Sequence, residues 1–225
     1  MFEGVKFVEA PQAQSTSPFA EIDTRGYFVS RSLFKLGFDI LFSSAALLFL
    51  LPFFALVAIL IKLDSPGPVF FLQQRGGLNG KLFKIYKFRS MTWTGRTDDI
   101  VQASQNDKRV TRIGKILRKT SLDELPQLIN ILRGEMSVVG PRPHAMAHDF
   151  EFAMAVPTYM RRFQTRPGLT GLAQVNGLRG AIKVRSDLER RVQADIDYIE
   201  HWSFAKDLVI VLKTLPLVFM DETAF

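Results

Sequence analysis

The sequence contains no cysteine, and it has only three histidines among its 225 residues. Disulfide bonds and thiolate zinc sites are therefore excluded, and few ligands remain for soft metals. It also lacks a Gly-x-x-x-x-Gly-Lys-Ser/Thr phosphate loop and a Gly-x-Gly-x-x-Gly dinucleotide turn, which disfavours a P-loop nucleotidase and a Rossmann enzyme. Any metal ion is expected to be Mg²⁺ or Mn²⁺ held by oxygen ligands.

Acidic residues are the scarcer charge, because 22 Asp plus Glu face 29 Lys plus Arg, which leaves a net charge of +7. A basic chain favours an anionic partner: nucleic acid, a lipid surface or a phosphorylated substrate. The basic residues gather beside an apolar segment, so we expect the lipid bilayer and a phosphorylated substrate as partners and no nucleic acid. The length fits one catalytic domain with an appended segment.

Charge is absent altogether from 40–61, a run of 22 residues that is long enough to enter a membrane. A buried core helix is the alternative. Pro52 lies near the middle of the run and disfavours a straight helix there. Basic residues flank both ends, and such residues prefer the cytoplasmic side. A re-entrant helix-break-helix satisfies both flanks, and a tilted, kinked full span is the alternative.

The predicted fold class is α+β and mainly helical, with a membrane-anchored monotopic domain and a small β-hairpin or sheet. We divide the chain into a leader or linker (1–30), a re-entrant membrane anchor (31–62) and a cytosolic catalytic domain with interfacial helices (63–225). Alternating apolar residues and the glycines between the two segments predict a hairpin from 69–73 and 82–88. Helical spacing predicts helices at 110–119, 192–202 and 208–220.

Two adjacent acids, Asp123 and Glu124, precede a short apolar segment in Thr120-Ser-Leu-Asp-Glu-Leu-Pro-Gln-Leu128. Pro126 fits the first turn of a helix, so we expect a helix from 124 or 125 to 133 with Gly134 as its left-handed stop. Asp123 would then lie near the N-cap, and Ser121 with Glu124 matches a capping box. The same position at the positive end of the helix dipole favours an ionised carboxylate and binds phosphate. Capping and phosphate chemistry both remain open on these residues.

An ionised carboxylate can attack phosphorus and form an acyl phosphate. A pyrophosphate would be repelled unless Mg²⁺ at one or both acids, together with basic side chains, neutralised the charge. The local candidates are Lys87, Arg118, Arg142 and Arg166. Asp195 and Asp197 lie two apart on a predicted helix, so at most one of them would face a common site.

Five segments in this order resemble the bacterial sugar transferases, the monotopic phosphoglycosyl transferases, over about residues 31–215. They are Lys87-Phe-Arg-Ser-Met91, Thr120-Ser-Leu-Asp-Glu-Leu-Pro-Gln127, Gly134-Glu-Met-Ser-Val-Val-Gly-Pro-Arg-Pro143, Arg166-Pro-Gly-Leu-Thr-Gly171 and Asp195-Ile-Asp-Tyr198 through Trp202-Ser203. The resemblance implies an enzyme of the bacterial inner membrane that faces the cytoplasm and starts exopolysaccharide or other glycoconjugate assembly. It would move a sugar 1-phosphate from a UDP-sugar to polyprenyl phosphate, commonly undecaprenyl phosphate, and release UMP.

The resemblance also implies roles for single residues. Asp123 would be the nucleophile that forms a phosphosugar-aspartate intermediate, and Glu124 would support it and share the Mg²⁺ site. Substrate phosphate or nucleotide contacts are expected at Lys87, Arg89, Arg118, Arg142, Arg166 and Asp195. A homodimer and the downstream glycosyltransferases are further partners that such an enzyme would have.

Two departures from the family pattern stand out. Leu51 precedes Pro52 where the family often has Ser-Pro, which puts the sharpness of the membrane bend in question. Leu178-Arg179-Gly180 resembles the catalytic half of larger members that use UDP-glucose or UDP-galactose. A membrane-associated UDP-sugar phosphohydrolase and a catalytically silent membrane scaffold are the alternative functions.

Overall fold

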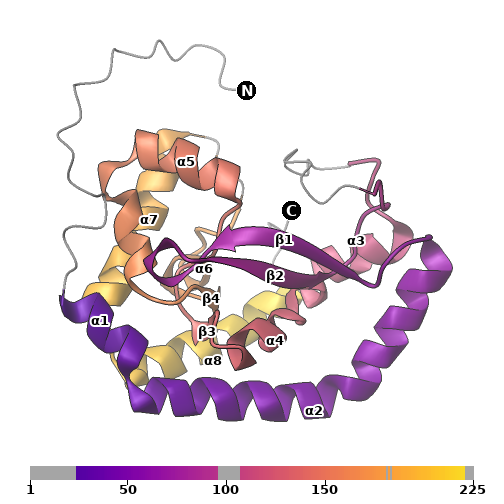
Figure 1. Cartoon of the computed structure of the whole chain (residues 1–225), viewed down its shortest axis with the longest axis horizontal. Coiled ribbons are helices and arrows are strands. Elements are labelled where there is room, and N and C mark those ends of the chain that lie inside the picture. Colours follow the sequence, from indigo (N-terminus) through magenta and orange to yellow (C-terminus); the bar gives the residue numbers. More distant parts are fainter. Residues whose placement is uncertain (1–23, 96–106, 181, 183, 221–225) are drawn as a thin grey trace.

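The structure is a computed structural model that describes residues 24–95, 107–180, 182 and 184–220. Helices dominate the described chain and surround two small two-stranded sheets. Figure 1 shows helix α2 running along one side of the molecule, helix α5 on the opposite side and the hairpin β1–β2 between them. The mainly helical fold with a small β-hairpin is as predicted. Residues 1–23 of the predicted leader lie outside the described residues.

The predicted leader is too long, because helix α1 already begins within it. Helix α1 spans Thr24–Arg31, and its Val29 is buried in the main hydrophobic core. Helix α2 follows at once over Leu33–Asp64, with the Ser32 side chain accepting a hydrogen bond from the Lys35 amide at its start. The hydrophobic core therefore already includes a helix that precedes the apolar segment.

Helix α2 does not end at Pro52, which corrects the predicted helix-break-helix. The helix continues for 32 residues with Pro52 inside it, and Figure 1 shows that it bends instead of breaking. A proline without an N–H loses one helical hydrogen bond and crowds the preceding turn, so the bend is the expected accommodation. At about 1.5 Å per residue the helix is about 48 Å long, well beyond a hydrocarbon core of about 30 Å.

The first turns of helix α2 bury polar residues, whereas many large apolar residues of the helix are exposed. Lys35, Asp39 and Ser43, spaced four apart, are buried against the rest of the protein. Its exposed large apolar residues are Leu33, Phe34, Ile40, Leu41, Phe42, Leu48, Phe49, Leu51, Leu56, Ile59, Leu60 and Leu63. The helix is long and apolar enough to cross a membrane by length and composition. An apolar outer surface around a polar inner face is what contact with lipid requires, and it argues against the buried core helix.

The predicted hairpin is confirmed. Strand β1 (Phe70–Gly76) pairs antiparallel with strand β2 (Leu82–Phe88) across the full length of both. The turn contains a 3₁₀ segment, η1 (Leu78–Gly80), in which Asn79 adopts a φ of 55°. Strand β2 turns Phe83, Ile85 and Phe88 inward, where they join hydrophobic core clusters.

A second sheet, which the sequence did not predict, lies at the centre of the fold. Strand β3 (Ser137–Val139) pairs in parallel with strand β4 (Gly168–Thr170). Glycine is required at this crossing, since a Cβ built on Gly168 would lie 2.1 Å from the Gly140 nitrogen. The close approach fixes the segment after β3, which leads directly to Arg142.

The remaining helices pack around this sheet. The amphipathic helix predicted at 110–119 is present as α3 (Arg112–Lys119), and α4 (Gln127–Leu132) follows it. Helices predicted at 192–202 and 208–220 correspond to α7 (Arg185–Glu200), which begins earlier than expected, and α8 (Phe204–Met220). The other helical segments, absent from the prediction, are α5 (Met146–Ala155), the 3₁₀ helix η3 (Pro157–Gln164) and α6 (Leu172–Val175).

Candidate active site

The two adjacent acids lie on a 3₁₀ turn and not at a helix N-cap. Helix α3 ends at Lys119, and Ser121 turns the chain with a left-handed φ of 55°. The turn η2 (Leu122–Glu124) carries both acids, and α4 begins only after Pro126. Ser121 makes no side-chain capping bond, and the Glu124 carboxylate is directed elsewhere. The predicted capping box is therefore wrong, whereas Gly134 does adopt the predicted left-handed conformation, with a φ of 72°.

Glu124 is held by two basic side chains from different parts of the chain. Lys87 Nζ, on β2, donates to Glu124 Oε1 at 2.8 Å. Arg142 makes a two-pronged contact, with Nη2 at 2.6 Å from Oε1 and Nη1 at 2.8 Å from Oε2. Although burial opposes ionisation, Arg142 and Lys87 hold the pKa of the Glu124 carboxyl well below its usual range. Both carboxylate oxygens are thus occupied, and Glu124 is fixed as an anion.

Asp123 contrasts with its neighbour, because its carboxylate has no hydrogen-bond partner within the described residues. The side chain is half-buried. Burial and the adjacent Glu124 charge raise its pKa to about 6, against the attraction of Lys87, Arg118 and Arg142. The group is therefore largely ionised at neutral pH and is not neutralised by a direct ion pair. This is the state that a carboxylate nucleophile requires.

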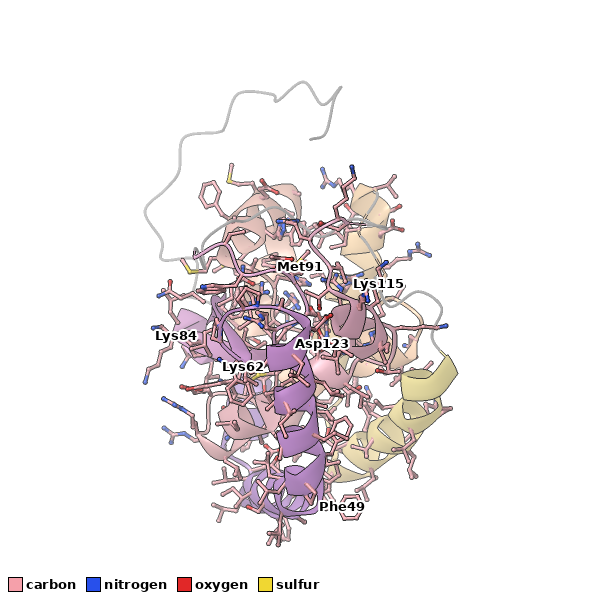
Figure 2. The ribbon with its side chains drawn as sticks, turned by 90° about the vertical axis from the view of Figure 1, so that its right-hand side faces the viewer. Phe49, Lys62, Lys84, Met91, Lys115 and Asp123 are labelled. Carbon is pink, nitrogen blue, oxygen red and sulfur yellow. The ribbon has the colours of Figure 1, made fainter. Side chains whose placement is uncertain are left out.

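Hydrophobic packing places the turn against the second half of α2. Leu122, directly before Asp123, packs against the cluster that contains Val57 and Ile61 of α2 and Leu117 of α3. In Figure 2 this arm of the helix is seen from the side and runs upward from Phe49 to Lys62, with Asp123 labelled beside its upper part. The acids therefore lie next to the helix whose exposed face is apolar.

Arg142 is held by its backbone as well as by Glu124. Its carbonyl accepts a hydrogen bond of 2.6 Å from Arg162 of η3. Arg162 in turn forms a buried ion pair with Asp195 of α7, at 2.7 Å, and donates to the Tyr159 hydroxyl at 2.9 Å. Burial raises the pKa of Asp195 despite the Arg162 charge. Asp195, predicted to contact the substrate, lies instead behind Arg142.

The structure brings together five of the eight predicted site residues, whereas Arg89 and Arg166, like Asp195, lie apart from them. Asp123, Glu124, Lys87, Arg118 and Arg142 interact electrostatically around one turn. Arg89 is buried and donates to the carbonyls of Ile61, Ser65 and Pro66, at 3.2, 2.6 and 2.8 Å. It closes the last turn of α2, where unpaired carbonyls attract a cation. Arg166 is also buried and donates to the Ser30 carbonyl at 3.1 Å.

Several polar residues behind the acids had not been predicted. Arg75 of β1, Asp149 of α5 and Tyr159 of η3 surround Arg142 and Arg162. Tyr159 donates to Asp149 and lies 2.7 Å from His144 Nδ1. Burial and the Arg142 charge lower the pKa of Arg75 to about 10. These residues come from three separate elements at irregular spacing, so only their charged or aromatic character was visible in the sequence.

The donor set suits a divalent ion bound together with substrate and not one held by protein alone. Among the described residues, no group of three or more His, Asp or Glu side chains is placed to hold a metal. Mg²⁺ commonly takes one or two carboxylates and completes its shell with water and substrate phosphate. Asp123 fits that role through its unpaired carboxylate, whereas both oxygens of Glu124 are already engaged.

Comparison with known proteins supplies the family. The model of the bacterial sugar transferase family matches residues 30–221. A UDP-glucose:undecaprenyl-phosphate glucose-1-phosphate transferase of Caulobacter vibrioides is 53% identical over 77% of this chain and 65% of its own length. The Escherichia coli protein of the same name is 46% identical over 86% of this chain but 42% of its own length. The exopolysaccharide production protein PSS of Rhizobium leguminosarum bv. phaseoli is 49% identical, over 80% of this chain and 92% of its own.

The chain thus spans about two fifths to two thirds of the length of the first two relatives and most of the third. The match to the family model extends from the end of α1 through α8, and it includes Asp123, Glu124 and the basic residues Lys87, Arg118 and Arg142 around them. The chain belongs to the bacterial sugar transferase family.

Proposed function

We propose that the protein transfers a sugar 1-phosphate from a UDP-sugar to polyprenyl phosphate and releases UMP. The family membership supports this activity, as do relatives whose names state glucose-1-phosphate transfer to undecaprenyl phosphate. UDP-glucose is the first donor to test, although a relative from Aeromonas hydrophila is named for UDP-N-acetylgalactosamine. Relatives named for exopolysaccharide production favour a role at the start of that assembly.

The observation that carries the proposal is the difference in hydrogen bonding between the two acids. Glu124 is neutralised by Lys87 and Arg142, whereas Asp123 has no direct partner and is surrounded by cations at longer range. A purely structural pair of acids would be expected to have both carboxylates satisfied. One free carboxylate beside a basic cluster is the arrangement that attack on a phosphate group requires.

The transfer then proceeds in two displacements at phosphorus. An Asp123 carboxylate oxygen attacks the sugar-bearing phosphorus of the UDP-sugar, the bond to the bridging oxygen breaks, and UMP leaves with that oxygen. A polyprenyl phosphate oxygen next attacks the same phosphorus and breaks its bond to Asp123. The product is a polyprenyl diphosphate sugar, and the Asp123 carboxylate is regenerated. Arg118, Arg142 and Lys87 stabilise the charge on the phosphate oxygens in both steps.

Asp123 would hold Mg²⁺ together with the substrate diphosphate, and the ion would supply further charge neutralisation there. Glu124 contributes indirectly, because its contacts with Lys87 and Arg142 fix the two cations beside Asp123. Its role in this proposal is therefore to position those cations and not to coordinate the metal.

Membrane association explains how a lipid phosphate reaches Asp123. The apolar surface of α2 favours contact with lipid, and α8 adds the exposed residues Leu208, Val209, Leu212 and Leu215. We infer that α2 is re-entrant, so that both of its ends, with Arg31 and Lys62, lie on the cytoplasmic side of the inner membrane. The bend near Pro52 supports this inference because it allows the helix to turn back within one leaflet.

The activity is tested with the protein in lipid vesicles, supplied with UDP-glucose, Mg²⁺ and undecaprenyl phosphate. UMP release is expected, and Asp123→Asn should abolish it. UDP-glucose labelled in the sugar should leave label on wild-type protein when the lipid acceptor is withheld, and mass spectrometry should locate it on the Asp123 peptide. Asp197→Asn, which changes an exposed acid, is the matched control. Full turnover by Asp123→Asn would refute the covalent route.

The two alternative functions give different results in the same assay. A phosphohydrolase would release UMP at the same steady rate with and without polyprenyl phosphate, because water would be the acceptor. A silent scaffold would release none with any UDP-sugar. A strict requirement of steady-state turnover for the lipid phosphate is the result expected here.

The topology of α2 is tested in a separate labelling experiment. This experiment is possible because the sequence contains no cysteine, so single cysteines can be introduced. Single cysteines placed at Arg31 and at Lys62 should both react with an impermeant reagent from the same side of sealed membranes. Reaction from opposite sides would show that α2 crosses the bilayer and would refute the re-entrant arrangement.

A further inference from the structure

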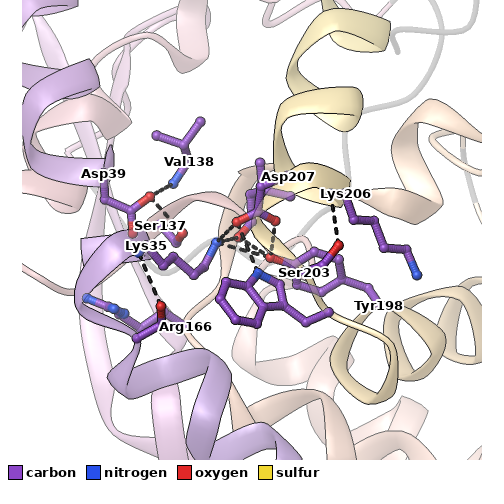
Figure 3. Close-up of polar contacts among 12 residues, drawn as sticks. Lys35, Asp39, Ser137, Val138, Arg166, Tyr198, Ser203, Lys206 and Asp207 are labelled. Carbon is purple, nitrogen blue, oxygen red and sulfur yellow. Dashed lines mark hydrogen bonds and ion pairs between the residues drawn. The ribbon is translucent and has the colours of Figure 1, made fainter. Parts of the chain in front are cut away.

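One turn of α2 holds strand β3 through two buried charged side chains. Lys35 and Asp39 lie four residues apart on the inner face of the helix, and each is 1% exposed. Figure 3 shows both side chains directed toward β3 and the elements beside it. Together they contact all three residues of the strand, Ser137, Val138 and Val139.

Lys35 connects three elements at one point. Its Nζ donates to the Val139 carbonyl at 2.9 Å, to Asp207 Oδ2 of α8 at 2.7 Å and to the Tyr198 hydroxyl of α7 at 3.0 Å. The Tyr198 hydroxyl donates to Asp207 Oδ1 at 2.8 Å, and the Trp202 indole donates to Oδ2 at 3.1 Å. All three protons of the ammonium group therefore have acceptors, and both Asp207 oxygens are occupied.

Asp39 fixes the other end of the strand. Its Oδ1 accepts hydrogen bonds from the Ser137 hydroxyl and the Val138 amide, both at 2.9 Å. The strand is thereby bonded to α2 through an amide, a carbonyl and a side chain. Contacts to backbone groups fix the position of the strand along the helix, which apolar packing alone does not do.

Strand β3 leads directly to the active-site arginine. Val139 is followed by Gly140 and Pro141 and then by Arg142, which binds Glu124 through two nitrogens. The Gly140 amide donates to the Thr170 carbonyl at 2.9 Å, so the segment between Val139 and Arg142 has little freedom to absorb a shift. A displacement of the Val139 carbonyl is therefore transmitted to the Arg142 guanidinium.

Stability alone gives a poor account of the Lys35–Asp207 pair. Removing two charges from water is costly, and apolar side chains of similar volume often do as well or better. A buried pair that also binds a backbone carbonyl adds defined geometry. The position of that carbonyl, three residues before Arg142, indicates what the geometry serves.

We propose that Lys35 and Asp207 are positioning residues that set Arg142 against Glu124 through the Val139 carbonyl. The inference rests on the proposed function only in its consequence for turnover. Through this contact, the helix with the lipid-facing surface defines the position of an active-site cation. Neither residue touches the substrate.

The variant that tests the proposal is Lys35→Met/Asp207→Asn, in which both charges are removed together. Lys35→Met alone would leave Asp207 buried and unpaired, and the protein could then fail to fold. The control is Lys206→Met/Asp197→Asn, which removes a partly exposed ion pair of 3.0 Å between α8 and α7, at the positions directly before Asp207 and Tyr198. Both proteins are assayed in vesicles, well below their thermal transitions.

Turnover by the Lys35→Met/Asp207→Asn protein should fall about 10- to 100-fold in kcat, because a shift of about 1 Å in a positioning contact has effects of that size. The KM for UDP-glucose should change less than about threefold, and the control pair should match the wild type. In an Arg142→Lys background the same double substitution should cost little more, since the contact acts through Arg142. An unchanged kcat, or an equal loss in the Arg142→Lys background, would overturn the proposal.

Hydrogen exchange of the segment 137–140 provides a readout that does not depend on activity. Exchange of the Val138 and Gly140 amides should be faster in the Lys35→Met/Asp207→Asn protein than in the control pair. Unchanged exchange would overturn the proposal even if wild-type protein released no UMP. Failure of the wild type to turn over UDP-sugars would instead count against the proposed function alone.

Discussion

Asp123→Asn is expected to raise the stability of the folded protein at neutral pH while it removes the proposed nucleophile. The Asp123 carboxylate is half-buried beside the Glu124 anion, and these two causes raise its pKa from 3.8 to about 6. Lys87, Arg118 and Arg142 pull the pKa the other way, and the net rise shows that they do not compensate. The ionised side chain is therefore less favourable in the folded protein than in the unfolded chain.

The direction of this stability change follows from proton binding. A carboxyl whose pKa is raised by folding binds its proton more tightly in the folded state, so wild-type stability falls as the pH rises from about 4 to about 6. Above that window the penalty is constant. Below pH 4 the group is protonated in both states and the penalty disappears.

The size of the expected stability gain follows from the size of the Asp123 pKa shift. About two pKa units at 1.36 kcal/mol each give an upper limit of about 3 kcal/mol. Solvent near a half-buried carboxylate reduces this, so a neutral Asn should gain about 1–3 kcal/mol at pH 7.5. For a chain of this size each kcal/mol raises Tm by about 2–4 °C, so an increase of roughly 2–10 °C is expected.

The assay is thermal denaturation in detergent at pH 7.5 and pH 4, with a chelator and without nucleotide, so that no ligand stabilises the wild type selectively. Asp197→Asn is the control, because the Lys206 hydrogen bond lowers the pKa of that exposed acid and no gain is expected. A lower or unchanged Tm for Asp123→Asn at pH 7.5 would refute the reasoning. An equal gain at pH 4 would show that ionisation is not its cause.

Three further substitutions separate the roles of the neighbouring residues. Glu124→Gln should destabilise the protein by about 2–4 kcal/mol at pH 7, because it leaves two cations without their anion. The pKa of Glu124 in the folded protein lies well below its usual range, so this loss of stability should shrink only below about pH 4. A series of thermal melts at different pH values measures it. Arg89→Met should lower Tm through three lost hydrogen bonds but leave kcat and KM within about threefold, whereas a raised KM would restore the predicted phosphate contact. Gly168→Ala, whose Cβ would meet the Gly140 nitrogen at 2.1 Å, should lower kcat at least about tenfold, while Gly180→Ala, with open space around it, should not.

The sequence was sufficient where one local pattern decides the structure. Strand β2 alternates apolar and polar residues over Leu82–Phe88, and α3 has its apolar residues at helical spacing, so both were predicted almost to the residue. Pro126 correctly indicated that a helix follows the acids. The exact start differed because a 3₁₀ turn precedes it, and Ser121 adopts a left-handed conformation that its residue type does not signal.

The partners of the acids could be predicted only as candidates, because they come from distant positions. Lys87 and Arg142 meet at Glu124 from either side of it in the chain. Arg89 lies two residues beyond Lys87, yet it turns toward the end of α2 and closes that helix. Two basic residues of the same motif thus have different roles, which spacing alone could not distinguish.

The polar face of α2 is a structural signal that is already present in the sequence. Lys35, Asp39 and Ser43 recur every fourth residue at the start of a segment that is otherwise apolar. On a helix surrounded by lipid such a stripe can only face protein, because charged groups in hydrocarbon need partners. The stripe therefore indicates which side of α2 carries the catalytic fold before any contact is known.

Helix α2 contacts the site from two directions, and the stripe makes the first of these contacts. The first turns of α2 hold β3, and with it Arg142, through Lys35 and Asp39. Its second arm packs against Leu122, the residue before Asp123. The bend at Pro52 lies between these two contacts, so its angle affects the distance between Arg142 and Asp123. A straight helix of the same length could not follow both sides of the fold, and for this reason the proline matters to the geometry of the active site as well as to the membrane.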